Sequence, residues 1–230
     1  VVIPALNEES SIGRVIGDIP DIVDYIVVAD NGSIDATAER AQRAGAVVVD
    51  EPERGYGAAC LRALDQLAER DPDIIVFLDG DGSDYPGEMA LLCDPIIDGT
   101  ADLVIGSRMI HPASRRHLPP ASRFGNALAS AIIQLWTPAR FTDLGPFRAI
   151  TRDALGRLQM ADRNYGWTVE MQLKAGLIGL RCAEVPVSYR ARTAGRSKVS
   201  GSVTGSCKAG AKILWTLVRH AGFTDPRRES

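Results

Sequence analysis

Cysteine is scarce in this sequence, and its cysteines are not spaced as metal or redox pairs. Cys60, Cys93, Cys182 and Cys207 lie far apart, without a Cys-x-x-Cys spacing. This absence argues against a structural zinc site and against a dithiol redox motif. Reduced, structural thiols in a cytoplasmic protein are the expectation that follows.

Long apolar runs and a strong excess of one charge are also missing. No run reaches the roughly 18 to 20 uncharged apolar residues that a membrane-spanning helix needs. The 26 basic and 29 acidic residues leave a formal net charge of −3, which argues against a nucleic-acid-binding surface as the main interaction. The 230 residues, 45% of them hydrophobic, predict one domain over residues 1–222 and a short tail at 223–230.

The first third of the chain repeats the order strand, polar loop, helix. Short apolar stretches at 1–6, 25–29 and 46–49 each run into a polar or glycine-containing loop, and helical stretches follow at about 11–19, at 36–44 and up to Ala68. This order predicts an α/β fold with a mostly parallel central sheet and helices on both faces. In such sheets, ligands bind at the carboxyl ends of the strands.

Two carboxylates, Asp79 and Asp81, follow the apolar run Ile74–Leu78 directly. Because that run predicts a buried strand, both carboxylates are expected in the crevice at its carboxyl end. Hard oxygen ligands that are few in number suit a Mg²⁺ or Mn²⁺ ion that keeps positions open for phosphate oxygens. Taken alone, the motif leaves open an acidic turn that only solvates the strand end, since Asp is a favoured turn residue.

Several short motifs together resemble the signature of family 2 glycosyltransferases with the GT-A fold. In order, they are Pro4-Ala5-Leu6-Asn7-Glu8-Glu9, Asp30-Asn31-Gly32-Ser33, Arg54-Gly55-Tyr56-Gly57 and Asp79-Gly80-Asp81. Ile105-Gly106-Ser107-Arg108 and Arg196-Ser197-Lys198-Val199 resemble, within that family, the polyprenyl-phosphate and dolichol-phosphate sugar synthases. The resemblance covers residues 1 to 200 approximately, and it implies an inverting glycosyltransferase.

The resemblance implies that residues 1–107 bind a nucleoside-diphosphate sugar. Glu8 is expected to accept a hydrogen bond from a ribose hydroxyl, and Asp30 one from the base, which suits UDP and GDP equally. Gly55 is expected to let the backbone approach the nucleotide, although a loop that needs positive φ explains this glycine as well. The nucleotide-binding residues expected from the resemblance are Pro4, Asn7, Glu8, Asp30, Gly55 and Asp79.

The resemblance also assigns the expected metal and catalytic roles. Asp81 is expected to bind the ion directly, and Asp79 to bind the ribose or, through water, the ion. Similar synthases often carry an amide two residues beyond the second Asp, but here that residue is Ser83. Either Asp84 or water is therefore expected to supply the remaining ligand.

Residues 108–222 are expected to hold the acceptor. Basic residues crowd the stretch from Arg108 to Arg123, and the apolar stretch Ala127–Trp136 follows it. This combination suggests a polyprenyl phosphate bound at the cytoplasmic membrane face, with a solvated basic loop as the alternative. The expected acceptor-binding or phosphate-binding residues are Arg108, Arg123, Arg148, Arg196 and Lys198.

Two features leave the acceptor open. The segment from Asp143 to Arg148 resembles the family's Asp…Gly-Phe-Arg segment, but its spacing is one residue shorter than in lipid-phosphate mannosyl transfer. Glu170 is expected either to be the general base for a hydroxyl acceptor or to be a structural carboxylate at a helix start, since a phosphate acceptor needs no base. A soluble hydroxylated or phosphorylated acceptor, a sugar nucleotidyltransferase and a catalytically silent nucleotide-sugar-binding module are the alternatives. The sequence does not indicate an oligomeric state.

Overall fold

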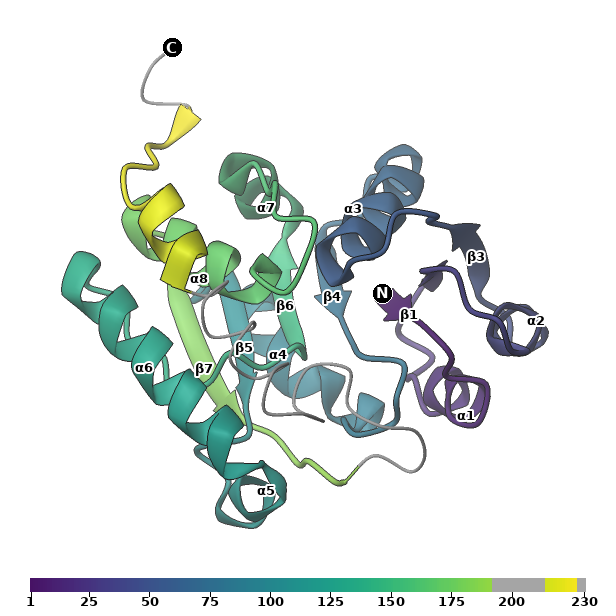
Figure 1. The fold of residues 1–230 in the computed structure, drawn as a ribbon. Helices are drawn as coiled ribbons and strands as arrows, with labels where there is room; N and C mark the ends of the chain where they lie inside the picture. The colour runs from purple at the N-terminus through teal and green to yellow at the C-terminus, as the bar shows by residue number, and fades with distance from the viewer. Residues whose placement is uncertain (192–213, 227–230) are drawn as a thin grey trace.

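The computed structural model describes residues 1–191 and 214–226, and the strands in these residues join into one seven-stranded sheet. The strand order is β3-β2-β1-β4-β6-β5-β7 (Figure 1). The strands are β1 (Val2–Ala5), β2 (Val27–Asp30), β3 (Val47–Asp50), β4 (Ile74–Phe77), β5 (Leu103–Ser107), β6 (Arg148–Thr151) and β7 (Cys182–Pro186).

The sheet is parallel except at β6. β1 pairs in parallel with β2 and β4, β2 with β3, and β5 with β7, whereas β6 runs antiparallel between β4 and β5. The register sets Phe77 opposite Arg148. The carboxyl ends of the parallel strands therefore share one edge of the sheet with the amino end of β6. The predicted mostly parallel α/β sheet is confirmed.

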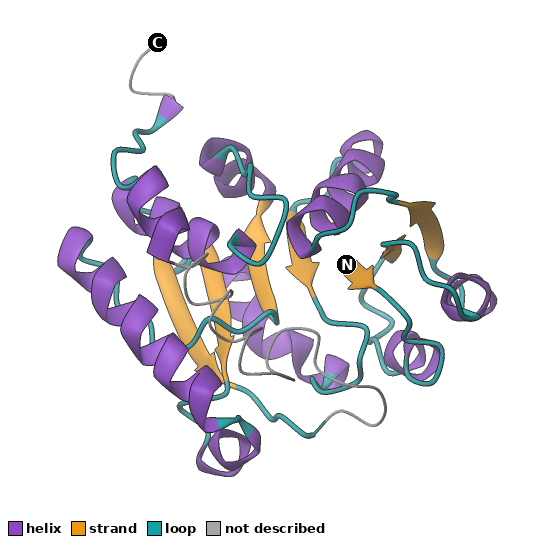
Figure 2. Cartoon of the chain, in the orientation of Figure 1, coloured by secondary structure: helices purple, strands orange, loops and turns teal. Residues whose placement is uncertain are grey.

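Helices cover both faces of the sheet (Figure 2). Val2 and Ile3 are neighbours in β1 but belong to two separate buried clusters, because successive side chains of a strand point to opposite faces. The helices α3 (Tyr56–Leu67), α6 (Pro120–Trp136), α7 (Arg152–Leu158) and α8 (Trp167–Leu177) pack on the Val2 face. The helices α1 (Ile12–Gly17), α2 (Thr37–Arg43) and α4 (Met89–Ile97) pack on the Ile3 face.

The basic stretch after β5 is helical, so its interpretation as a loop is wrong. It contains α5 (Pro112–His117), and α6 begins at Pro120 and not near Ala127, which puts Arg123 on a helix. Proline at the first turn explains both starts, since its fixed φ suits that position and its missing N–H would be unbonded there. Among the described residues, none of the helices is both long enough and apolar enough to cross a bilayer.

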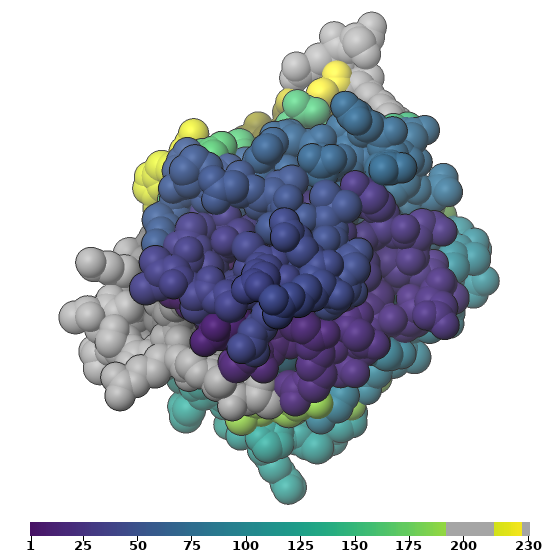
Figure 3. Space-filling model, turned by 90° about the vertical axis from the view of Figure 1, so that its right-hand side faces the viewer, coloured from purple at the N-terminus to yellow at the C-terminus, as the bar shows by residue number. Residues whose placement is uncertain are grey.

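The N-terminal third of the chain forms one side of the molecule (Figure 3). At the other end of the chain, two residues that the sequence assigns to the tail pack against the domain. Phe223 packs on the buried cluster of the Val2 face, and the Asp225 carboxylate accepts a hydrogen bond from Arg157. The described part of the chain therefore stays attached to the fold up to Asp225.

Candidate active site

The loops after β1 and β2 bring three of the predicted nucleotide-binding residues to one edge of the sheet. Asn7, in the left-handed region at φ 53°, donates its backbone N–H to the Ser33 hydroxyl over 2.9 Å. The same hydroxyl and the Ser33 N–H both donate to the Asp30 carboxylate. Glu8, next to Asn7, is almost fully buried. The contacts through Ser33 thus fix Asn7 and Asp30 beside each other, and Pro4 lies within β1 in register with Ala29, the residue before Asp30.

Ser11 connects this edge to the Asp79-Gly80-Asp81 motif. Its hydroxyl donates to the Gly80 carbonyl oxygen over 2.8 Å, and its backbone N–H donates to the Glu8 carbonyl oxygen over 3.0 Å. Ser11 is buried, and these contacts hold the start of α1 against the turn that follows β4. The sequence reasoning assigned Ser11 no role, because the contact spans 69 residues of the chain.

Asn31 organises the next loop, and sequence reasoning missed its role too. Its side-chain amide donates to the carbonyl oxygens of Glu51 and Glu53, at 3.0 and 2.6 Å, and accepts from the Gly55 N–H at 2.8 Å. A single buried amide therefore sets the path of the chain from β3 into α3. The signal in the sequence was its position one residue after Asp30, in the turn that ends β2.

Gly55 and Gly57 are required by close packing between two backbones. A Cβ atom on Gly55 would overlap the carbonyl oxygen of Arg163, and one on Gly57 would overlap that of Asp162. The Ala58 N–H donates to the Arg163 carbonyl oxygen over 2.9 Å along the same seam. Packing against residues 162–164 therefore accounts for these glycines, and the predicted nucleotide contact of Gly55 remains a prediction.

Three carboxylates lie close together after β4. Asp81 is buried and accepts a hydrogen bond from the Ser83 N–H at 2.8 Å, and Asp79 is half-buried. Asp84 is almost completely buried, and among the described residues neither of its carboxylate oxygens has a hydrogen-bond partner. Burial, and next the charge of Asp79, raise the pKa of Asp84 well above its ordinary value.

This arrangement fits a divalent cation with open coordination positions. Burying an ionised carboxylate that has no hydrogen-bond donor, next to two other carboxylates, costs free energy. A bound cation would offset both the loss of hydration and the repulsion between the carboxylates. The described residues contain no group of three or more His, Cys, Asp or Glu side chains arranged to hold an ion together. In this geometry an ion would have fewer than three of these side chains as ligands, with the other positions open for phosphate oxygens or water.

A second layer of buried polar groups lies beneath Asp79. Burial, and next the charge of Asp79, raise the pKa of the Tyr56 hydroxyl and of the Cys60 thiol well above their ordinary values, so both are neutral. Arg148 is fully buried on β6, and its guanidinium donates to carbonyl oxygens, including those of Gly145 and Thr168. Burial lowers the pKa of Arg148 to about 10, which still leaves it charged at neutral pH. Arg148 thus binds backbone and is not presented to an acceptor in this geometry.

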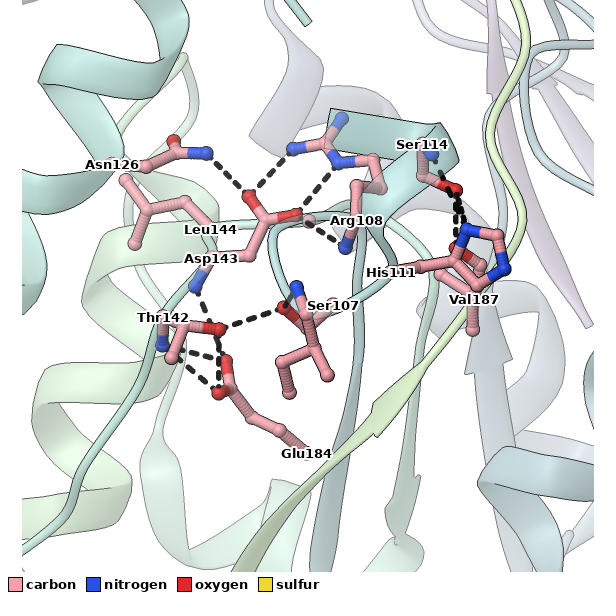
Figure 4. A network of polar contacts seen from close by, with 12 residues as sticks. Ser107, Arg108, His111, Ser114, Asn126, Thr142, Asp143, Leu144, Glu184 and Val187 are labelled. Atoms are coloured by element: carbon pink, nitrogen blue, oxygen red, sulfur yellow. Dashed lines mark hydrogen bonds and ion pairs between the residues drawn. The ribbon is translucent and has the colours of Figure 1, made fainter. Parts of the chain in front are cut away.

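Arg108 follows β5 and is held by Asp143 in a forked ion pair (Figure 4). Its Nε lies 2.8 Å from Asp143 Oδ2, and its Nη2 lies 2.9 Å from Oδ1. The Arg108 side chain is 12% exposed, whereas that of Asp143 is completely buried. Despite burial, the Arg108 charge holds the pKa of Asp143 below its ordinary value. The Asn126 side chain on α6 donates to the same carboxylate.

A neighbouring set of contacts fixes the loop that carries Asp143. Glu184 on β7 accepts from the Thr142 N–H at 2.8 Å and from the Asp143 N–H at 3.2 Å. The hydroxyls of Ser107 and Thr142 lie 2.7 Å apart (Figure 4). Strands β5 and β7 therefore jointly position Asp143 and, through it, Arg108.

The chain after β7 returns along the turn with the carboxylates. Asp84 and Tyr189 form an antiparallel bridge, and Arg190 Nε donates to the Gly82 carbonyl oxygen over 2.6 Å. The Arg108 guanidinium lies 5.0 Å from the centre of the Tyr189 ring. These contacts bring Arg108 into the same neighbourhood as Asp84. Burial opposes the charge of Arg108, but Asp143, and after it Asp84, raise the pKa of its guanidinium above the ordinary value.

Glu170 lies in α8 (Trp167–Leu177), and its partners are a different set of residues. Its carboxylate is fully buried and accepts from the backbone N–H groups of Ala161 and Asp162, at 3.0 and 2.7 Å. Lys174 Nζ lies 2.7 Å from the same carboxylate. Of the predicted acceptor residues, Arg123 is exposed on α6, while Arg196 and Lys198 lie outside the described residues.

With this geometry in place, comparison with known proteins decides the family. The family model described as glycosyl transferase family 2 matches residues 1–159. The chain belongs to this family. It is therefore a glycosyltransferase, as its motifs predicted.

Relatives and solved structures agree with the family assignment. An uncharacterized glycosyltransferase of Mycobacterium tuberculosis is 40% identical over 206 residues, covering 90% of this chain and 91% of that protein. The undecaprenyl-phosphate mannosyltransferase of Micrococcus luteus is 29% identical over 216 residues, covering 89% of this chain and 88% of that protein. The structure of glucosyl-3-phosphoglycerate synthase from M. tuberculosis, in complex with Mn²⁺, UDP-glucose and phosphoglyceric acid, matches with a TM-score of 0.75 and 26% identity, covering 98% of this chain and 80% of that one. The predicted GT-A fold is confirmed by this similarity.

Proposed function

We propose that this glycosyltransferase moves a sugar from a nucleoside-diphosphate sugar to a polyprenyl phosphate, in an inverting displacement that depends on a divalent cation. The acceptor assignment rests on the geometry of Arg108. A guanidinium has five N–H groups, and Asp143 accepts from two of those of Arg108. The three that remain, beside Asp84 and the turn after β4, suit the oxygens of an incoming phosphate.

The donor half of the proposal rests on the edge formed by β1, β2 and β4. Asn7, Glu8 and Asp30 lie together there, Pro4 lies within β1, and Asp79 follows the end of β4. The M. tuberculosis synthase, which has the same fold, binds UDP-glucose and Mn²⁺. Asp81 and one neighbouring carboxylate, Asp79 or Asp84, are proposed to hold Mn²⁺ or Mg²⁺. When bound, the cation neutralises the diphosphate leaving group as the sugar bond breaks.

A phosphate acceptor also agrees with the position of Glu170. Two backbone N–H groups and Lys174 occupy its carboxylate, which a general base for a hydroxyl acceptor would need to turn toward the substrate. A phosphate oxygen is already an anion and needs no base. We therefore assign Glu170 a structural role. The names of the M. luteus mannosyltransferase and of the Haloferax volcanii dolichyl-phosphate hexose transferase, 34% identical over 203 residues, support a lipid phosphate acceptor.

One observation favours a second candidate, transfer to a soluble phosphorylated acceptor. The M. tuberculosis synthase was solved with phosphoglyceric acid, and its similarity extends over 98% of this chain. The forked Arg108 would suit the phosphate of a small molecule as well as that of a lipid.

A donor-by-acceptor screen separates the two candidates. UDP- and GDP-sugars are offered with Mn²⁺ or Mg²⁺ to polyprenyl phosphate in detergent, to phosphoglyceric acid and to a non-phosphorylated polyprenol. We expect transfer to polyprenyl phosphate alone, and a raised KM for that acceptor in Arg108→Lys, which keeps the charge but loses the fork. Donor binding by Arg108→Lys, measured by calorimetry, should be unchanged. Transfer to the polyprenol, or loss of transfer in Glu170→Gln with an intact fold, would contradict the proposal.

A further inference from the structure

The outer face of α6 is apolar, whereas its buried face carries polar residues. Asn126 and Ser130 are buried against the domain, together with Ala129 and Ile133. On the opposite side of the helix, the exposed residues are Phe124, Ala127, Leu128, Ala131 and Leu135. A surface helix normally has the reverse arrangement, with its polar face toward water.

The exposed apolar residues form one continuous stripe. Phe124, Leu128, Ala131 and Leu135 follow the spacing of four, three and four residues that aligns side chains on one face of a helix. Phe124 is 71% exposed and Leu135 is 81% exposed. Figure 1 shows α6 along one margin of the molecule, with its N-terminal end beside α5. We call these four side chains the α6 stripe.

The residues of fixed charge near the α6 stripe in the sequence are all cationic. From Leu103 to Thr142 there is neither Asp nor Glu, although the whole chain contains 29 acidic residues. Arg115 and Arg116 are exposed on α5, Arg123 is exposed on α6, and Arg140 is exposed shortly after α6. An apolar stripe with cations at both of its ends matches the boundary between acyl chains and anionic headgroups.

We propose that the α6 stripe is the surface by which this glycosyltransferase docks on an anionic lipid bilayer, with the helix lying in the plane of the interface. This inference deepens the proposed function, because it says how a lipid-borne acceptor would reach the site. Asn126, on the opposite side of α6 from the stripe, donates to the Asp143 carboxylate that holds Arg108. A helix seated in the interface therefore brings the phosphate-binding Arg108 close to the headgroup level.

Vesicle flotation with the full chain tests the docking surface without any acceptor. Vesicles of phosphatidylcholine and phosphatidylglycerol in equal parts are compared with vesicles of phosphatidylcholine alone. We expect the protein to float with the anionic vesicles, and the double variant Phe124→Ser/Leu135→Ser to bind them at least about tenfold more weakly. The matched control is Ile22→Ser/Ile97→Ser, which removes two similarly exposed isoleucines outside α6, at 67% and 69% exposure, and should float like the parent.

A second test concerns the arginines beside the α6 stripe, and a third asks whether a second copy of the chain covers the stripe instead of lipid. Arg115→Gln/Arg116→Gln should reduce the preference for anionic vesicles, as should added salt. Absence of flotation by the parent protein, or an equal loss in the isoleucine control, would overturn the proposal. So would a dimer in sedimentation that Phe124→Ser/Leu135→Ser converts to a monomer, because a second copy would then cover the stripe. Calorimetric donor binding by each variant shows whether it is folded.

The proposed docking surface and the proposed acceptor can be rejected independently of each other. The vesicles contain no polyprenyl phosphate, so flotation reports on the α6 stripe alone. The acceptor screen in detergent reports on transfer alone. Flotation without transfer to polyprenyl phosphate would reject the acceptor and keep the surface, whereas transfer in detergent without flotation would reject the surface.

Discussion

The guanidinium of Arg108 and the carboxylate of Asp143 form a forked ion pair that joins the end of β5 to the loop before β6. Both side chains are buried or nearly so, and Asp143 has no exposed area. A buried pair of this kind contributes little compared with apolar packing, but the loss of one partner leaves the other as an uncompensated charge. The pair should therefore be sensitive to single substitutions.

Asp143→Ala should destabilise the protein strongly. Removing one partner of a buried pair typically costs about 3–5 kcal/mol. Urea unfolding should show this cost as a lower free energy of unfolding. The control is Arg43→Ala, which breaks the exposed pair between Arg43 and Glu39 on α2 and should cost about 1 kcal/mol or less. Equal costs for the two variants would contradict the structural role of Asp143.

Asp84→Asn should stabilise the metal-free protein at neutral pH. The folded-state pKa of Asp84 is raised above its ordinary value of 3.8, so the folded state loses stability as the pH rises from 3.8 through the raised pKa. An amide avoids that loss, which for a buried group without partners is about 1–3 kcal/mol. Thermal unfolding in EDTA across this pH range should show a higher Tm and a flatter pH dependence in the variant.

Adding Mn²⁺ to the parent and to Asp84→Asn tests whether the Asp84 carboxylate takes part in cation binding. If Asp84 is the second ligand of the proposed site, the parent should gain more thermal stability from the cation than Asp84→Asn, because the ionised carboxylate would be stabilised by the cation. Titration calorimetry in buffers of different ionisation enthalpy should also detect proton release from the parent on binding. An equal Mn²⁺ effect in both proteins would show that Asp84 does not sense the ion.

Gly57→Ala should lower the free energy of unfolding, and Gly156→Ala should raise it. A Cβ on Gly57 would overlap a backbone carbonyl oxygen, which cannot move aside as a side chain can. A Cβ on Gly156 in α7 meets nothing within 4 Å, and alanine at a helical position is favoured over glycine by about 0.8–1.0 kcal/mol. Urea unfolding of both variants measures the difference, and a neutral Gly57→Ala would show that the backbone seam can open.

Glu170→Gln should change stability more than rate. Removing a general base usually costs about 10²–10⁴ in rate, so a loss of kcat below about tenfold would support the structural assignment. The substitution leaves the buried Lys174 without its charged partner, and the free energy of unfolding should fall accordingly. An unchanged free energy of unfolding together with a large loss of kcat would identify Glu170 as the base.

The sequence was sufficient for features that depend on local pattern. The apolar run before Asp79 predicted β4, and the polar turns after β1 and β2 correctly placed Asn7 and Asp30 at one edge of the sheet. The position of β6 was not predictable in this way, because its insertion between β4 and β5 depends on pairing across the whole chain. The partner of Arg108 was missed for the same reason, since Asp143 lies 35 residues further along.

Other sequence-based expectations differ from the structure because one residue type can occur in two settings. Proline begins helices as well as occurring in loops, and arginine can bind backbone carbonyl groups as well as a ligand. The basic stretch from Arg108 to Arg123 had a solvated loop as its alternative interpretation, but Pro112 and Pro120 each begin a helix, which places Arg123 on α6. Arg148 was expected among the acceptor-binding or phosphate-binding residues because its segment resembles the family's Asp…Gly-Phe-Arg segment. Its register opposite Phe77 instead buries it in the sheet, and no local pattern indicates that register.

The seam between α3 and residues 162–164 constrains how this enzyme can be recombined. Gly55 and Gly57 leave room for the carbonyl oxygens of Arg163 and Asp162, and main-chain hydrogen bonds cross the seam. A chimaera that takes its first hundred residues from one relative and the remainder from another would have to inherit both sides of this contact together. A C-terminal segment taken from a relative can therefore replace its counterpart at a single crossover point only if its backbone at residues 162–164 fits against these two glycines.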